Sequence, residues 1–224
     1  MDLRTIGVVI PAYNAAKTIS GVIEQLTDYG FDKKNVIVVN DGSADKTADI
    51  VRSMGVALID VGKNKGKGAA LRAGFTLARE AGLDKVFVID ADGQHDVRDI
   101  SNFLALNGRY DILIGERQNI LESMPLARRW TNRTVNLVVS LLAKSRTSDV
   151  QCGLRCINLK IFKKMVLKTS RYETESEMVI KAARRRCSVG FVPIKTIYAT
   201  ERSYVNPLVD TIRFINMSVR SLWR

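Results

Sequence analysis

The chain has 224 residues, of which 46% are hydrophobic, so it can form one globular domain with a sizeable core. Its formal net charge of +12 predicts attraction to polyanions, which include nucleic acid, an anionic membrane surface and phosphorylated substrates. The three cysteines are an odd number without a repeating spacing, which argues against a disulfide framework and for a reducing compartment. With a single histidine in the chain, Cys152 and Cys156 lack the partners for a structural zinc site.

No apolar run approaches the roughly 20 residues that are needed to cross a bilayer. Residues 6–12 are apolar, but they are too few for a signal peptide, and no ordinary cleavage site follows them. We therefore expect a cytoplasmic protein that is either soluble or peripheral on the cytoplasmic face of a membrane.

Short apolar runs alternate with segments of helical periodicity in the first half of the chain, and the second half is less regular. The expected strands are residues 6–12, 36–39, 56–61, 85–89, 111–115 and 191–198. The expected helices are residues 16–29, 45–54, 68–81, 130–143, 174–186 and 207–223. Single helices between the early strands indicate βαβ units, so we expect an α/β fold with a mostly parallel sheet covered by helices on both faces.

The last expected helix is amphipathic, because its apolar residues share one face and Arg213, Arg220 and Arg224 share another. Such a basic helix can lie in a membrane interface, and it can equally well pack on the domain. No linker or repeat divides the rest of the chain. We expect one domain at residues 1–204 and a C-terminal amphipathic helix at residues 205–224.

Two carboxylates follow the apolar strand at residues 85–89, in the segment Asp90-Ala91-Asp92. On an extended chain, side chains two residues apart point the same way, so the two negative charges repel unless a cation lies between them. Mg²⁺ is usually bound by one or two carboxylates together with substrate phosphates. The pair therefore predicts a divalent cation that holds a diphosphate, and a polar turn with surface acids is the alternative.

Two other expected strands end in polar segments, one in Pro11-Ala12-Tyr13-Asn14 and the other in Asp41-Gly42-Ser43. In a parallel sheet, these segments and the Asp90–Asp92 pair lie on one edge, where open α/β sheets bind ligands. Tyr13 could stack on a base, and Asp41 could accept hydrogen bonds from a base or ribose. Taken singly, each residue could equally be a rim aromatic or a turn former.

A glycine-rich basic loop, residues 62–68, precedes the third expected helix. Such loops can hold phosphate through backbone N–H groups, although no Ser or Thr completes a P-loop motif here. A flexible, solvated loop is the alternative.

These segments together resemble the family 2 glycosyltransferases of GT-A (Rossmann-like) fold, and within them the dolichol-phosphate mannose synthase and polyprenyl-phosphate glycosyltransferase branch. The resemblance runs from residue 8 to about residue 157, in VVIPAYNAAKTI, VIVVNDGSADKTADIV, GKGAALRAGF, VFVIDADGQHDVRDI, ILIGERQ and SDVQCGLRCI. It departs from the common pattern at Ala15, where an acidic residue is frequent, and at Asn40, where an aspartate is usual.

The resemblance implies a nucleotide diphosphate sugar of the GDP-mannose or UDP-glucose type as donor, with Mg²⁺ or Mn²⁺ bound by Asp90 and Asp92. The donor-binding residues that it implies are Pro11, Tyr13, Asn14, Asp41, Asp90, Ala91, Asp92, Gln94, Arg117 and Arg202. It also implies an inverting reaction in which a hexose, mannose or glucose, passes to dolichyl or polyprenyl phosphate at a membrane surface.

Catalytic roles are expected for Asp92, Arg117 and Asp149. A sugar hydroxyl would need a general base, whereas a lipid phosphate is already ionised, so with a phosphate acceptor Asp149 would orient arginines. His95 is a base or a turn residue. The candidates for gripping the acceptor phosphate, because arginine binds phosphate in a bidentate manner, are Arg117, Arg128, Arg129, Arg133 and Arg155.

Two other functions stay open at this point. The same fold could act on a sugar hydroxyl of a glycan or a lipid-linked oligosaccharide. The basic charge could alternatively mark a nucleic-acid binder, but no helix-turn-helix or base-stacking signature accompanies it, so we expect no nucleic-acid partner.

Overall fold

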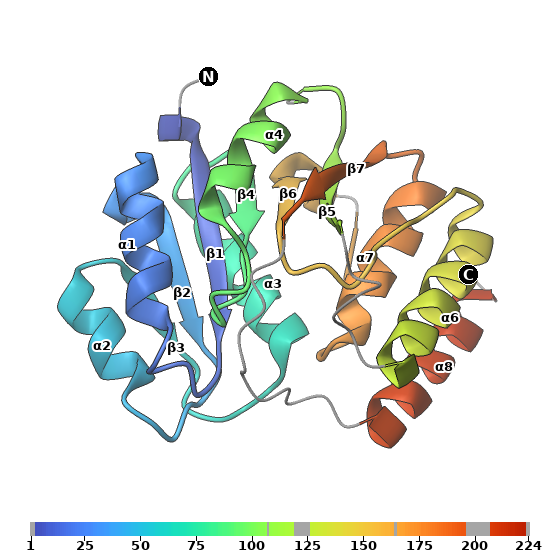
Figure 1. Ribbon diagram of the computed structural model, residues 1–224, viewed down its shortest axis with the longest axis horizontal. Coiled ribbons are helices and arrows are strands. Elements are labelled where there is room, and N and C mark those ends of the chain that lie inside the picture. The colour runs from blue at the N-terminus through green and yellow to red at the C-terminus, as the bar shows by residue number, and fades with distance from the viewer. Residues whose placement is uncertain (1–2, 107, 119–125, 164, 196–206, 223–224) are drawn as a thin grey trace.

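The computed structural model describes residues 3–106, 108–118, 126–163, 165–195 and 207–222. In this part of the chain, seven strands form one sheet in the order β3-β2-β1-β4-β6-β5-β7 (Figure 1). The strands are β1 (Ile6–Ala12), β2 (Val36–Asn40), β3 (Ala57–Asp60), β4 (Lys85–Val88), β5 (Ile112–Arg117), β6 (Arg155–Asn158) and β7 (Val189–Ile194). The helices are α1 (Ile19–Tyr29), α2 (Thr47–Met54), α3 (Lys67–Glu80), α4 (Ile100–Ala105), α6 (Leu126–Ala143), α7 (Glu173–Arg184) and α8 (Pro207–Leu222).

The expected mostly parallel sheet is confirmed, with one strand as the exception. β1 pairs in parallel with β2 and β4, and β5 pairs in parallel with β7. β6 was not expected from the sequence; it lies between β4 and β5 and runs antiparallel to both. Because of this direction, the start of β6 lies at the edge where β1, β2, β4 and β5 end, so its leading loop joins the same edge.

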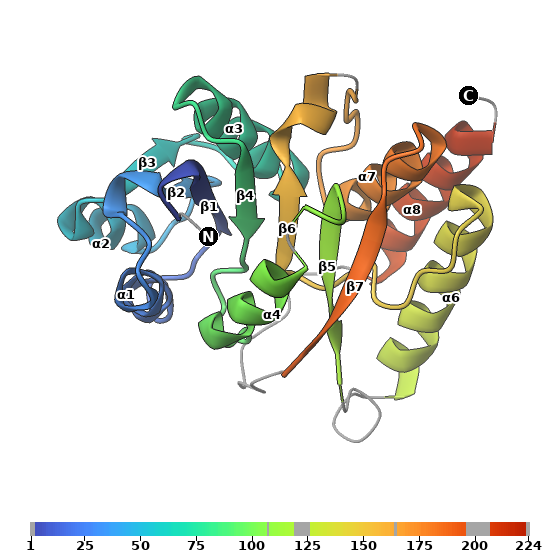
Figure 2. The same cartoon turned by 90° about the horizontal axis from the view of Figure 1, so that it is seen from above.

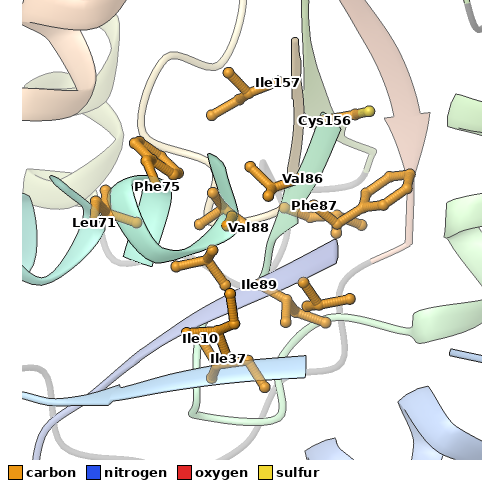
Figure 3. Close-up of a cluster of buried hydrophobic side chains, with 14 of the residues drawn as sticks. Ile10, Ile37, Leu71, Phe75, Val86, Phe87, Val88, Ile89, Cys156 and Ile157 are labelled. Atoms are coloured by element: carbon orange, nitrogen blue, oxygen red, sulfur yellow. The ribbon is translucent and has the colours of Figure 1, made fainter. Parts of the chain in front are cut away.

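The core lies on both faces of the central strands. β2 is buried along its whole length, as expected for a parallel strand covered on both sides. Figure 3 shows Val88 of β4 on the side of Phe75, with Phe87 on the opposite side of the strand. Phe87 makes edge-on ring contacts with Phe31 and Phe103, so α4 and the segment after α1 cover the face opposite α3.

At the far end of the sheet, α7 supports α6 and α8, which lie side by side in both views (Figures 1 and 2). Arg184 of α7 donates hydrogen bonds to the carbonyl oxygens of Leu142 in α6 and Ser221 in α8, so one guanidinium joins all three helices. Met217 faces inward from α8 and is buried, whereas Ile212 and Ile215 are exposed. The helix expected at residues 207–223 is present, and its association with a membrane stays a prediction. No helix in the described part of the chain is both long and apolar enough to span a bilayer.

Gly74 determines how closely α3 packs on β1. A Cβ atom at this position would collide with Val9 in β1, whereas a Cβ at Gly21 in α1 would meet no atom within 4 Å. Gly74→Ala should therefore lower the free energy of unfolding by about 1–3 kcal/mol through overpacking. The matched Gly21→Ala should raise it by about 0.5–1 kcal/mol, because alanine is the better helix former. Urea unfolding of both variants measures this difference, and equal effects would contradict the packing.

Candidate active site

A cavity of about 1420 Å³ opens at the sheet edge formed by the ends of β1, β2, β4 and β5 and continues between α6, α7 and α8. It brings together most of the donor-site residues expected from the sequence, namely Pro11, Tyr13, Asn14, Asp41, Asp90, Ala91, Asp92, Gln94 and Arg117. The remaining one, Arg202, lies outside the described residues. The convergence of these loops follows from the strand order, but the role of each residue in binding stays a prediction.

The loops that follow β1 and β2 hold each other in place. The backbone N–H of Asn14 donates to Ser43 Oγ over 2.9 Å, and the N–H of Ala44 donates to Asn14 Oδ1 over 2.8 Å. Asn14 adopts a left-handed conformation with a φ of 50°, which asparagine tolerates better than most residues. These bonds fix the backbone directly after Tyr13, which lines the cavity.

Asp41 organises the glycine-rich loop. Its buried carboxylate accepts hydrogen bonds from the backbone N–H of Lys65 over 2.8 Å and from that of Gly66 over 2.7 Å. A Cβ atom at Gly42 would lie 2.6 Å from the backbone of Asn64, so glycine is required for this close approach. The loop is therefore docked on the end of β2 rather than free in solvent, and Asp41 both lines the cavity and holds the loop.

A buried ion-pair network lies beneath the carboxylate pair. Lys67 Nζ is 2.6 Å from Asp90 Oδ1 and 2.9 Å from Glu175 Oε1, and Arg155 Nη2 is 3.2 Å from the same Glu175 oxygen. Glu175 and Arg155 are 3% and 1% exposed, so these charges need one another, because an unpaired buried charge is strongly destabilising. The network joins the end of β4 to α3, α7 and β6.

Two glycines make this meeting of helices possible. Gly66 has a φ of +96°, and a Cβ atom there would lie 2.5 Å from Ser170 O. A Cβ atom at Gly68 would collide with Thr174 in the first turn of α7. Because both glycines lack side chains, α3 begins against the start of α7, and Lys67 reaches Glu175.

The pKa values of Asp90 and Asp92 are shifted in opposite directions. Burial, the largest single cause, would raise the pKa of Asp90, but the charge and hydrogen bond of Lys67 act together with the other positive charges nearby, and the net effect is that the pKa of Asp90 is lowered. Burial, followed by the negative charge of Asp90, raises the pKa of Asp92, although the N–H of Gln94 donates to Asp92 Oδ1 over 3.0 Å. A second negative charge is therefore costly here unless a further cation arrives.

The Asp90–Asp92 pair suits a divalent cation that is shared with a substrate. Asp90 and Asp92 are two neighbouring carboxylates, and the pKa of Asp92 is raised by burial and then by the charge of Asp90; such an oxygen donor set is of the kind that Mg²⁺ and Mn²⁺ bind. The described residues contain no group of three or more His, Cys, Asp or Glu side chains that could hold a metal ion.

Asp149 and Arg117 form a bidentate pair. Arg117 Nε and Nη2 lie 2.7 and 2.8 Å from the two carboxylate oxygens of Asp149, which is 4% exposed. Arg117 lines the cavity at the end of β5, so the carboxylate behind it fixes the orientation of its guanidinium. The contact places Asp149 beside an arginine, and its role in orienting that arginine rather than accepting a proton stays a prediction.

The other expected acceptor arginines are placed differently. Arg133 is exposed on α6 and is not among the residues that line the cavity. The side chains of Arg128 and Arg129 lie outside the described part of the structure. Arg155 is buried at the start of β6, where it donates to the carbonyl oxygens of Cys152 and Val150 and pairs with Glu175. It is therefore a structural cation beneath the site, which corrects the expectation that it grips an acceptor phosphate.

Lys67 and Glu175 are the site residues that were not recognised from the sequence. Residues 62–68 were noted as a basic glycine-rich loop, but three lysines stand there and nothing in the pattern selects Lys67. Glu175 lies in the helix expected at residues 174–186, and nothing in that pattern selects it for the site. Their pairing depends on the contact between the starts of α3 and α7, which are far apart in the sequence.

His95 is buried on the cavity wall at 6% exposure. Burial is the main reason that its pKa is lowered to about 4; the negative charge of Asp90 opposes this shift, and the positive charges of Arg117 and Lys67 add to it. The imidazole is therefore neutral near pH 7. A general base works best with a pKa close to the operating pH, so His95 is a poor one.

Comparison with known proteins identifies the class of this molecule. The sequence profile of Glycosyl transferase family 2 matches residues 7–171, so the chain belongs to this family. A relative from Methanocaldococcus jannaschii, an uncharacterised protein, is 38% identical over 85% of this chain and 81% of its own length. A second, the UDP-N-acetylglucosamine–dolichyl-phosphate N-acetylglucosaminyltransferase of Methanococcus voltae, is 33% identical over 87% of this chain and 86% of its own length.

Solved structures show the same fold. Glucosyl-3-phosphoglycerate synthase from Mycobacterium tuberculosis, crystallised with Mn²⁺, UDP-glucose and phosphoglyceric acid, superimposes with a TM-score of 0.76. The superposition covers 97% of this chain and 79% of that one at 20% identity. Mannosyl-3-phosphoglycerate synthase from Rubrobacter xylanophilus gives a TM-score of 0.73 at 19% identity, over 98% of this chain and 73% of that one. The expected GT-A fold is confirmed.

The low pKa of His95 has a consequence for stability that can be measured. Its folded pKa, about 4, lies below the value of about 6.5 for an unfolded chain, so the unfolded state binds more protons between these pH values. The contribution of His95 is complete above about pH 6.5 and decreases as the pH falls toward 4, by about 3 kcal/mol at most. Urea unfolding without divalent cations should show a flatter pH dependence for His95→Gln, and an unchanged slope would contradict the assignment.

Proposed function

We propose that the protein transfers a hexose from a nucleoside diphosphate sugar to a polyprenyl or dolichyl phosphate, with inversion at the anomeric carbon. The observation that carries this proposal is a single cavity that contains the Asp90–Asp92 pair and continues as a chamber between α6 and α8, whose walls include several large apolar side chains beside polar ones. A charged donor and a lipid acceptor need these two environments side by side. The Methanococcus voltae relative, named for transfer to dolichyl phosphate, supports it.

The polar edge of the cavity binds the donor in this proposal. Tyr13 stacks on the base, Asp41 lies next to the ribose, and Asp90 and Asp92 receive a Mg²⁺ or Mn²⁺ ion together with the diphosphate. The bound cation supplies Lewis-acid stabilisation for the negative charge that grows on the leaving phosphate. Arg117, fixed by Asp149, lines the cavity and adds a preorganised positive charge there.

The acceptor half is suited to a nucleophile that needs no general base. A lipid phosphate is already mostly ionised near neutral pH, because its second ionisation is about 6. The two candidate bases named from the sequence are unsuited to this role, since Asp149 is paired with Arg117 and the pKa of His95 is about 4. The chamber walls include Val135, Val138, Leu142 and Phe214, which can contact an isoprenoid chain.

The names of related proteins, and not the shape of the cavity, indicate which sugars to test first. Names of related proteins specify transfer of N-acetylglucosamine in Methanococcus voltae and of glucose in Trichomonas vaginalis, the latter at 26% identity. We infer that a uridine diphosphate sugar is the first donor to test, with GDP-mannose as the comparison.

Product analysis tests this proposal. The protein is incubated with dolichyl phosphate, Mn²⁺ and one donor at a time: UDP-linked N-acetylglucosamine, UDP-glucose or GDP-mannose. One of these donors should give a glycosyl monophosphate lipid. Asp92→Asn should lower the rate by about 10²-fold or more, because donor and cation lose a shared ligand. The control Asp49→Asn changes an exposed carboxylate on α2 and should leave the rate unchanged. Transfer only to a glycan hydroxyl would favour the alternative acceptor, and full activity of Asp92→Asn would refute the site.

The outer surface of α6 and α8 supports peripheral binding to a membrane. Leu137 and Leu141 of α6 are 61% and 69% exposed, and Ile212 and Ile215 of α8 are 59% and 52% exposed. Neighbouring exposed arginines, Arg133 and Arg220, add positive charge, in keeping with the net charge of +12. We infer that this apolar and basic surface lies on an anionic bilayer, at the cytoplasmic face, where the chamber receives the acceptor from the lipid phase.

Vesicle sedimentation tests this orientation. The wild-type protein should bind vesicles that contain an anionic phospholipid more tightly than neutral vesicles. Leu137→Ser combined with Leu141→Ser should weaken binding by about tenfold or more, because each leucine loses about 1.5–3 kcal/mol of burial. Val166→Ser is the matched control, because Val166 is also 69% exposed but lies outside α6 and α8. Equal binding of all three proteins would contradict the membrane-facing assignment.

A further inference from the structure

A lysine, and not a third carboxylate, lies beside the Asp90–Asp92 pair. Lys67 Nζ is 2.6 Å from Asp90 Oδ1, so one oxygen of this aspartate already contacts a positive charge. Lys67 also lines the cavity, with its side chain 14% exposed. A divalent cation that enters the site without a nucleotide therefore meets a resident cation at one of its two carboxylate ligands.

Besides Asp90, a second carboxylate holds Lys67 in place. Lys67 Nζ also lies 2.9 Å from Glu175 Oε1, and Glu175 is itself paired with the buried Arg155. The absence of side chains at Gly66 and Gly68 lets the start of α3 lie directly against the start of α7, which carries Glu175. The positive charge at Lys67 is thus a fixed feature of the folded protein.

We propose that Lys67 makes cation binding at Asp90 and Asp92 conditional on the diphosphate of the donor, and that Glu175 is the positioning residue that keeps Lys67 there. This inference rests on the donor chemistry proposed above. The charge of Lys67 repels a bare divalent cation, and the same charge attracts a diphosphate. The cation and the diphosphate therefore bind with positive coupling, which is reciprocal by thermodynamic necessity.

The local balance of charge explains why the diphosphate is needed. Three carboxylates, those of Asp90, Asp92 and Glu175, face the two cations Lys67 and Arg155. That balance leaves little net negative charge to attract a divalent cation. A cation binds more strongly to carboxylates that are not already paired with positive charges. A diphosphate brings the missing negative charge and oxygen ligands, so metal and nucleotide complete the site together.

Calorimetric titration with Mn²⁺, alone and with UDP or GDP present, measures the coupling directly. The wild-type protein should bind Mn²⁺ weakly alone and at least about tenfold more tightly with the diphosphate, which corresponds to about 1.4 kcal/mol. In Lys67→Met, Mn²⁺ alone should bind about tenfold more tightly than in the wild type, whereas UDP or GDP in saturating Mn²⁺ should bind about tenfold more weakly. Lys63→Met removes an exposed lysine of the same loop and should change neither affinity.

A second variant covers the case in which Lys67→Met does not fold. Lys67→Met combined with Glu175→Gln removes one positive and one negative charge together, and the same two affinity changes are expected. Tight Mn²⁺ binding to the wild type without nucleotide, or a folded Lys67 variant in which bare Mn²⁺ binds no more tightly, would overturn the inference. Failure of the proposed function gives a different result, because neither UDP nor GDP would then bind the wild type with Mn²⁺.

Discussion

The chain of buried charges from Arg155 through Glu175 and Lys67 to Asp90 is the constraint on which the site depends. Each member comes from a different part of the fold: the start of β6, the first turn of α7, the first residue of α3 and the end of β4. Because none of these charges is tolerated unpaired in a low-dielectric interior, the four elements are held in one arrangement. The orientation of Asp90, and with it the cation site, follows from that arrangement.

The antiparallel strand β6 makes this chain possible. If every strand ran in parallel, the loop before β6 would lie at the opposite edge of the sheet, far from Asp90. Its reversed direction instead places Gly153 against Asp90, so closely that no side chain fits between them. The same loop carries Asp149, which fixes Arg117 at the end of the neighbouring strand β5. One reversed strand thus positions both the carboxylate and the guanidinium of the site.

The fold could be predicted from the sequence to the extent that local pattern determines it. Apolar runs such as residues 36–39 and the helical spacing of residues 68–81 identified most of the parallel sheet and its helices. β6 was not found because Arg155–Asn158 is only four residues long and contains a buried arginine, which lacks the apolar pattern of a central strand. The Asp90–Asp92 pair and the convergence of the strand ends were visible because strand direction alone brings them together.

The remainder of the site could not be read from the pattern, because it depends on contacts between distant segments. From the sequence, Arg155 was expected to bind the acceptor phosphate. Its burial and its pairing with Glu175 exist only in the folded protein, so the sequence could not show them. Lys67 had no feature that set it apart from Lys63 and Lys65, although only Lys67 lies at the start of α3 against α7. Arg202 and the side chains of Arg128 and Arg129 lie outside the described residues, so their expected roles stay predictions.

The central claim is that the Asp90–Asp92 pair holds a divalent cation together with a nucleoside diphosphate. X-ray diffraction from crystals grown with Mn²⁺ and UDP or GDP, collected near the manganese absorption edge, locates the ion directly through its anomalous scattering. An anomalous peak between Asp90 and Asp92, joined by diphosphate density, is the predicted result. A bound nucleotide with the manganese peak elsewhere, or with no peak at this pair, would contradict the account.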